Sequence, residues 1–155
     1  MASIAQAITE IVSPKPTALI PVSIGCEEIE VAALCGILAR GGVRVTVANV
    51  GGELHHVVKL AQGTGVQADK PIEFCANDSS KREQGSCPMA SDPVGKLALG
   101  ALYSNDKVVI AENCVTSEGP ATAIAMALAL VELLRGEKVA MNIAKDIAFK
   151  PIKKC

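Results

Sequence analysis

A strand, turn, helix and strand in succession between residues 18 and 50 constrain the fold of this chain more than any other feature. An apolar run from Ala18 to Ser23 has the length of a buried strand, and a helical pattern follows from about Glu28 to Arg40. Gly41 and Gly42 end that helix, and Val43 to Val50 then reads as a β-branched strand. Two strands joined by a helix predict a parallel sheet with a right-handed crossover, and therefore an α/β fold.

The helix of this unit begins with three carboxylates, Glu27, Glu28 and Glu30. The positive end of a helix dipole favours carboxylates, so all three can be solvated side chains that stabilise the first turn. We place the apolar face of the helix on Ile29, Ala32, Ala33 and Ile37. Glu30 lies close to that face, and strand-to-helix turns of open α/β sheets often carry chemistry. The residues alone leave both a capping role and a functional role open for Glu30.

The rest of the chain predicts further elements around a long polar stretch. Leu54 to Leu60 indicates a short strand, and the composition of residues 76–93 is that of an irregular linker. Val108–Ile110 and Cys114–Thr116 predict the two arms of a hairpin. Pro120 opens a helix that runs from Ala121 to Arg135 and is apolar nearly all round, which predicts burial. A last short element is expected over residues 139–144.

Length and composition exclude several classes of protein. A chain of 155 residues is most simply one domain, here with an N-terminal extension over residues 1–16. Lys and Arg total 15 against 16 Asp and Glu, and aromatic residues are nearly absent, so we expect no nucleic-acid partner. The most apolar stretch, Ala121 to Leu134, is too short to span a bilayer, and residues 1–16 lack the pattern of a signal peptide. We therefore expect no membrane partner.

Six cysteines are present, but their spacing is irregular and contains no CxxC pair. The two histidines, His55 and His56, are adjacent and would point to opposite faces of a strand, so we expect no metal site. The thiols indicate a reducing, cytoplasmic location, with Cys26 and Cys35 expected to be buried. No GxGxxG motif follows the first strand, so nucleotide binding ranks last and no cofactor is expected.

Several segments together resemble the ThiJ/PfpI superfamily, in its branch of parkinsonism-associated protein deglycases. They are IPVSIGCEEIE, RGGVRVTVANV, GTGVQADKPI, YSNDKVVIAENCVTSEGPAT and LALVELLRGEKVA, in the family's order. The resemblance implies a flavodoxin-like sandwich around a parallel sheet, of the class I glutamine amidotransferase type. It also implies a homodimer, thiol chemistry on reactive dicarbonyls or their adducts, chaperoning and a role in the oxidative stress response.

Residue by residue, the resemblance places Glu30 on the carboxylate that hydrogen-bonds the family's reactive cysteine and holds it as thiolate. It places Gly25, Gly119 and Pro120 at the rim of the pocket. Many relatives carry Arg before this Gly-Pro pair, whereas this chain carries Glu118, which reverses the charge at the rim.

The family's central segment is not readable between Phe74 and Gly100. Relatives carry there a Pro-Gly-Gly loop with oxyanion donors and a sharp strand-to-helix turn that bears the nucleophilic cysteine. Cys87 is the candidate for a displaced nucleophile, but a charged stretch precedes it and Pro88 follows it, where an elbow needs a buried strand. The sandwich is therefore expected to be incomplete in its middle.

Two functions follow from this comparison. In the first, a cysteine thiolate attacks a dicarbonyl carbon while Glu30 polarises the thiol. In the second, the chain keeps the family's surface without its chemistry. It then acts by self-association, by pairing with a full-length paralogue, or by holding unfolded proteins as a chaperone does.

Overall fold

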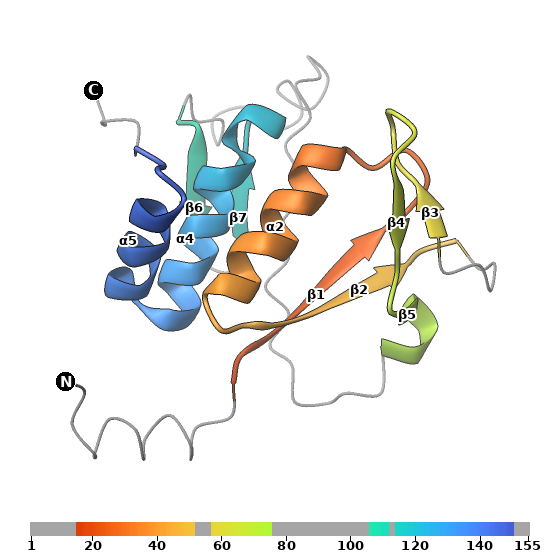
Figure 1. Cartoon of the computed structure of the whole chain (residues 1–155), viewed down its shortest axis with the longest axis horizontal. Helices are drawn as coiled ribbons and strands as arrows, with labels where there is room; N and C mark the ends of the chain where they lie inside the picture. The colour runs from red at the N-terminus through yellow and green to blue at the C-terminus, as the bar shows by residue number, and fades with distance from the viewer. Residues whose placement is uncertain (1–14, 52–56, 76–105, 112–113, 151–155) are drawn as a thin grey trace.

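The structure is a computed structural model that describes residues 15–51, 57–75, 106–111 and 114–150. In these residues, strands β1, β2 and β5 form one sheet, and two hairpins form separate two-stranded sheets. Helices α2 and α4 lie side by side, with α5 beyond α4 and the β3–β4 hairpin at the opposite end of the molecule (Figure 1). The expected N-terminal extension lies outside the described residues except for its last two positions, and the expected linker at 76–93 lies outside them entirely.

The parallel sheet predicted from the sequence is confirmed. Strand β1 (Thr17–Val22) pairs with β2 (Arg44–Asn49) in parallel, in a register that joins Ile20 to Val47. A further two-residue strand that the sequence pattern did not predict, β5 (Lys70–Pro71), adds to the other side of β2. The carboxyl ends of all three strands therefore lie along the same edge of the sheet.

Helix α2 (Glu28–Arg40) has the predicted bounds, but its predicted apolar face is partly wrong. Ile29 is 54% exposed and Ala32 is exposed, whereas Val31, Ile37 and Leu38 are buried. The buried face is thus rotated from the predicted one. α2 packs both on the sheet and on α4. Because nearly all residues in the middle of α2 are apolar, the sequence pattern does not show which of them face these partners and which face the solvent.

A hairpin of β3 (Val57–Lys59) and β4 (Gly65–Gln67) follows the first unit. Part of the strand predicted over Leu54 to Leu60 is confirmed as β3, and residues 54–56 lie outside the described ranges. After β5, a short 3-10 helix, η1 (Ile72–Cys75), ends this part of the chain.

The carboxyl-terminal part begins with the predicted hairpin, which is confirmed as β6 (Val108–Ala111) and β7 (Cys114–Ser117). A 3-10 turn, η3 (Pro120–Thr122), leads into α4 (Ala123–Arg135), which packs on β7. The predicted burial of this helix is confirmed over most of its length, and Glu132 and Leu133 near its end are exposed. The last predicted element is helix α5 (Glu137–Asp146), which packs on α4.

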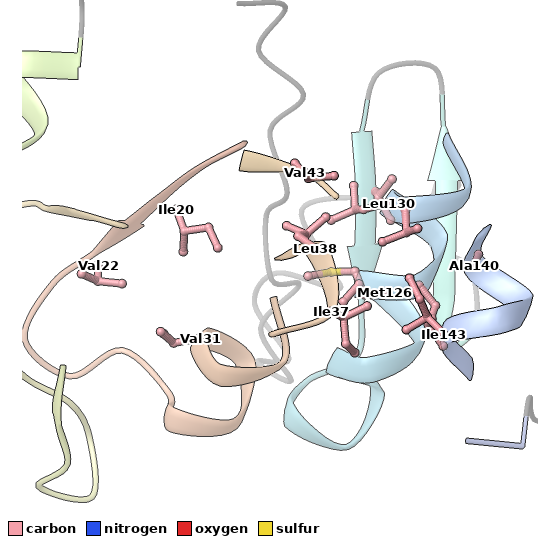
Figure 2. Packing of buried hydrophobic residues seen from close by; sticks show 14 of the residues in the cluster. Ile20, Val22, Val31, Ile37, Leu38, Val43, Met126, Leu130, Ala140 and Ile143 are labelled. Carbon is pink, nitrogen blue, oxygen red and sulfur yellow. The ribbon is translucent and has the colours of Figure 1, made fainter. Parts of the chain in front are cut away.

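The core joins these elements through α2 and α4. Figure 2 shows Ile37 and Leu38 of α2 close to Met126 and Leu130 of α4, with Val31 on the side of α2 toward β1. At the end of α2 the two helices approach closely, since a Cβ atom added to Gly41 would lie 3.0 Å from Val131 Cγ2. Arg135 Nε donates a hydrogen bond to Gly41 O at 3.1 Å, which fixes the end of α4 against the end of α2.

This contact predicts that Gly41→Ala destabilises the protein. Gly41 has a φ of −70°, which alanine adopts freely, so the cost comes from the added methyl group against Val131 and is expected at roughly 1–3 kcal/mol in urea melts. In a Val131→Ala background the same substitution should cost less, because the contacting methyl groups are gone. A matched substitution at an exposed position of α2, Ala32→Ser, should change stability by less than about 0.5 kcal/mol. Equal costs in both backgrounds would contradict this account of the α2–α4 contact.

Candidate functional site

The turn between β1 and α2 is held in place by the β3–β4 hairpin. Gly25 has a φ of +86°, a conformation that glycine adopts without strain, and its N–H donates to Lys59 O at 3.1 Å. Ala61 N donates to Cys26 O at 2.9 Å, which connects the turn to the residues that follow β3. The residues before α2 are therefore fixed from two sides, by the sheet and by the hairpin.

The three carboxylates at the start of α2 have three different roles. Glu27 is the N-cap, and its Oε2 accepts hydrogen bonds from Ile29 N at 2.6 Å and Glu30 N at 3.0 Å. Glu28 instead reaches the hairpin, where its Oε1 accepts from Gln62 N at 2.6 Å. The second oxygen of Glu28, Oε2, is buried and has no hydrogen-bond partner in the described structure. The interpretation of three solvated carboxylates that cap the helix therefore holds for Glu27 and is wrong for Glu28 and Glu30.

Glu30 is partly buried, and its carboxyl receives no hydrogen bond from any side chain in the described ranges. Burial raises the pKa of this carboxyl above its ordinary value, and the neighbouring Glu27 carboxylate raises it further. Glu30 thus differs from its two neighbours in being a partly desolvated acid that caps nothing.

The thiols of the described residues do not complete a site with Glu30. Cys26 Sγ accepts a hydrogen bond from Ser23 N at 3.3 Å and lies 3.7 Å from Ser23 Oγ. Burial raises the pKa of the Cys35 thiol and the Asp69 carboxylate raises it further, with a backbone hydrogen bond opposing both. A raised thiol pKa leaves less of the thiolate, which is the nucleophilic form.

Burial of the cysteines differs from the sequence-based expectation. Cys26 and Cys35, which were expected to be buried, are only partly so, whereas Cys75 is 7% exposed and its Sγ lies 3.7 Å from Pro71 O. The short helix η1 packs against β5 and carries Cys75 at its end. Cys87, the candidate nucleophile, lies outside the described residues.

The Gly-Pro turn before α4 is built by one threonine. Gly119 has a φ of +153° and its N–H donates to Thr122 Oγ1 at 3.2 Å, while the Thr122 hydroxyl donates to Gly119 O at 2.8 Å. Pro120 begins η3, and η3 contacts α2. The structure therefore brings the predicted rim residues Gly119 and Pro120 up to the helix that carries Glu30, with Gly25 at the turn before that helix. The sequence analysis did not single out Thr122. Its position two residues after Pro120, where a hydroxyl can reach the backbone of Gly119, could have indicated this role.

Other kinds of site receive no support from the described part of the chain. No three His, Cys, Asp or Glu side chains there come together as metal ligands. No helix among the described ones has the length and apolar character to cross a membrane. The arrangement offers one acid with a raised pKa, at a turn fixed by backbone hydrogen bonds.

Comparison with curated proteins finds distant relatives, and no family model matches the sequence. The chain is 24% identical over 184 residues to protein DJ-1 homolog A of Arabidopsis thaliana, covering 87% of this chain and 47% of the relative. It is 25% identical over 169 residues to the glutathione-independent glyoxalase DJR-1.2 of Caenorhabditis elegans, covering 78% of this chain and 89% of that protein. The chain spans less than half the length of the two Arabidopsis relatives it matches, at 47% and 40%.

Solved structures show the same fold. Drosophila melanogaster DJ-1β matches with a TM-score of 0.76 at 24% identity, covering 88% of this chain and all of that one. The VC2308 protein matches with a TM-score of 0.75 at 23% identity, and a ThiJ/PfpI family protein from Pseudomonas syringae with 0.71 at 12%. The predicted flavodoxin-like α/β fold is confirmed by these matches.

The raised pKa of Glu30 predicts a pH-dependent effect of Glu30→Gln. Between the ordinary pKa of 4.5 and the raised value, the folded protein holds a proton that the unfolded chain has released. Above the raised value the folded state carries a partly desolvated charge, so Glu30 lowers stability at pH 7. Glu30→Gln should leave thermal stability at pH 7 unchanged or higher, by up to roughly 1 kcal/mol, and the gain should vanish as the pH falls below 4.5.

The control for this prediction is Glu27→Ala, which removes the N-cap. It should cost about 0.5–2 kcal/mol at pH 7, since Glu27 Oε2 accepts two backbone N–H groups. A loss of stability at pH 7 in Glu30→Gln would show instead that the ionised carboxyl has a stabilising partner.

Proposed function

The chain belongs to the DJ-1/ThiJ/PfpI superfamily, on its DJ-1 branch, and from this premise we propose that it is a non-catalytic member that acts by binding. The observation that carries this proposal is the state of Glu30. The resemblance gives this carboxylate the task of holding a cysteine as thiolate, yet no thiol among the described residues is hydrogen-bonded to it.

Each thiol among the described residues is unsuited to be the reactive thiolate beside Glu30, each for a different reason. Cys26 is hydrogen-bonded within its own turn by Ser23, and the raised pKa of Cys35 disfavours its thiolate. Cys75 is buried beside Pro71, at the end of β5. At the rim, Glu118 replaces the arginine of many relatives, so an anionic substrate would meet a negative charge there. These features support a chain without the family's thiol chemistry.

Apolar side chains exposed around the β1–α2 turn support the binding role. Ile24 is 84% exposed, Ile29 is 54% exposed and Val57 is 57% exposed. Ile24 precedes Gly25, whose N–H donates a hydrogen bond to Lys59 O of β3. Val57 is the first residue of the same strand. Exposed apolar side chains of this kind are covered when proteins associate. We assign this surface to a second copy of the chain, with a full-length paralogue as the alternative partner and the cytoplasm as the location.

A second function, cysteine-dependent conversion of dicarbonyls, is favoured by two observations. One curated relative is named a glutathione-independent glyoxalase, and it matches this chain over 89% of its own length. The raised pKa of Glu30 also suits an acid that donates a hydrogen bond to a reacting group. In this function Cys87 is the nucleophile, its sulfur adding to the aldehyde carbon of the dicarbonyl while the carbonyl oxygen takes up a proton.

Loss of methylglyoxal from solution separates the two functions. We expect purified protein to consume it no faster than a denatured sample with the same thiol content, because a thiol without an activating site reacts only as a free thiol does. Cys87→Ser is the test variant and Cys26→Ser the matched control. Turnover that disappears in Cys87→Ser and survives in Cys26→Ser would overturn the non-catalytic proposal.

Light scattering after size exclusion tests the self-association. The chain has a mass of 16.0 kDa, so a second copy doubles the measured mass. Val57→Asp should shift the protein toward the monomer, because it places a charge among the exposed apolar side chains beside the β1–α2 turn. Met141→Asp, at a 63% exposed position on α5 far from the hairpin, should leave the mass unchanged (Figure 1). A monomeric wild-type protein at all concentrations would contradict the assignment to a second copy.

A further inference from the structure

The β3–β4 hairpin is small and depends on its neighbours for its position. Its strands have three residues each, and a hairpin of two short strands is marginally stable by itself in water. At its base, just after β4, Asp69 N donates to Val47 O of β2, and Val47 N donates to Asp69 Oδ2, both at 2.8 Å. Val58 and Leu60 of the hairpin are buried in the common core. The base is thus fixed to the sheet, and the connection between the two strands needs its own attachment.

That attachment is the start of α2 (Figure 1). Two backbone hydrogen bonds, donated by Gly25 N and by Ala61 N, join the hairpin to the β1–α2 turn. A third joins a side chain to the hairpin, since Gln62 N donates to Glu28 Oε1 at 2.6 Å. A hydrogen bond to an ionised carboxylate is shorter and stronger than one between neutral groups. Glu28 therefore makes the one contact among these three that a substitution can remove without altering the backbone.

The second oxygen of Glu28 shows that this bond is made at a cost. Oε2 is buried and has no hydrogen-bond partner within the described residues. A carboxylate oxygen that loses its water without gaining a donor disfavours the arrangement that buries it. The bond from Gln62 opposes this cost, so the closed position of the hairpin depends on the Oε1 contact.

We propose that Glu28 is a positioning residue that holds the β3–β4 hairpin against the β1–α2 turn and so keeps the exposed side chains of Ile24, Ile29 and Val57 in one surface. Ile24 and Ile29 belong to the turn and to α2, whereas Val57 belongs to the hairpin, so the surface is continuous only while the hairpin is closed. That a second copy covers this surface rests on the proposed function, whereas the positioning of the hairpin by Glu28 does not.

The experiment measures amide hydrogen exchange by NMR and mass by light scattering on the full-length chain. Glu28→Asp keeps a carboxylate in the first turn, where the helix dipole favours it, but is one methylene too short for the bond to Gln62 N. Glu28→Gln keeps the length and one acceptor oxygen, although a neutral amide is a weaker acceptor. Glu132→Asp, at an exposed position of α4, is the matched control for shortening a helical glutamate.

The informative amides are those of Gly25 and Ala61, because Glu28 contacts neither of their hydrogen bonds. In Glu28→Asp both are expected to exchange about tenfold faster than in the wild type, since the hairpin then opens more often as a unit. The amide of Val50, which donates to Val22 O at 2.8 Å within the sheet, should keep its rate. Glu28→Gln should lie closer to the wild type, and Glu132→Asp should match it. At a concentration where the wild type associates, Glu28→Asp should shift toward the monomer.

Three results would overturn the proposal. Faster exchange at Gln62 alone would show that Glu28 bonds this amide without holding the hairpin. Equal acceleration at Gly25 and Val50 would show that Glu28 acts on the stability of the whole fold. A faster-opening hairpin with unchanged association would remove the link between Glu28 and the surface. A wild-type chain that is monomeric at every concentration would overturn the assignment to a second copy, and the exchange rates decide separately whether Glu28 holds the hairpin.

Discussion

The close approach of α2 and α4 at Gly41 fixes the position of most other elements in the described structure. Because Gly41 has no Cβ, Val131 of α4 packs directly on its backbone, and Arg135 bonds its carbonyl oxygen. α2 in turn packs on β1 and β2, while α4 packs on β7 and α5. Two sheets that share no hydrogen bond in the described residues are thereby held in one arrangement by a pair of helices.

The same helix, α2, also positions the candidate site, which lies at its first turn. Its first residue follows a turn pinned by two backbone hydrogen bonds to the β3–β4 hairpin, and the Glu28 side chain adds a third bond to that hairpin. The other side of the site is set by η3, which contacts α2 and whose shape depends on the Gly119–Thr122 hydrogen bonds. At this turn, burial raises the pKa of the Glu30 carboxyl, and the Glu27 carboxylate, which accepts two backbone hydrogen bonds at the start of α2, raises it further.

The sequence predicted the elements whose cause is local and missed those whose cause is distant. β1, α2, β2 and the β6–β7 hairpin follow from apolar periodicity and glycine stops, and they were found. β5 has only two residues and forms by pairing with the free edge of β2, so it is too short to produce a periodic sequence pattern. The buried face of α2 and the burial of Cys75 depend on which partner packs against them, and a mostly apolar helix or a short turn does not encode that choice.

For the site, the sequence identified Glu30 but could not predict its burial, its hydrogen-bond partners or the direction of its pKa shift. The pattern of three glutamates allowed equivalent capping roles, whereas the structure gives the cap to Glu27, a hairpin bond to Glu28 and a raised pKa to Glu30. That division depends on the β3–β4 hairpin, because the Glu28 side chain accepts a hydrogen bond from Gln62 N, 34 residues further along the chain. Glu28 is engaged with the hairpin and Glu27 with two N–H groups, so Glu30 is the one of these three glutamates whose carboxyl forms no hydrogen bond within the described residues. Its partly buried carboxyl, with a pKa raised first by burial, is therefore the candidate acid of this turn.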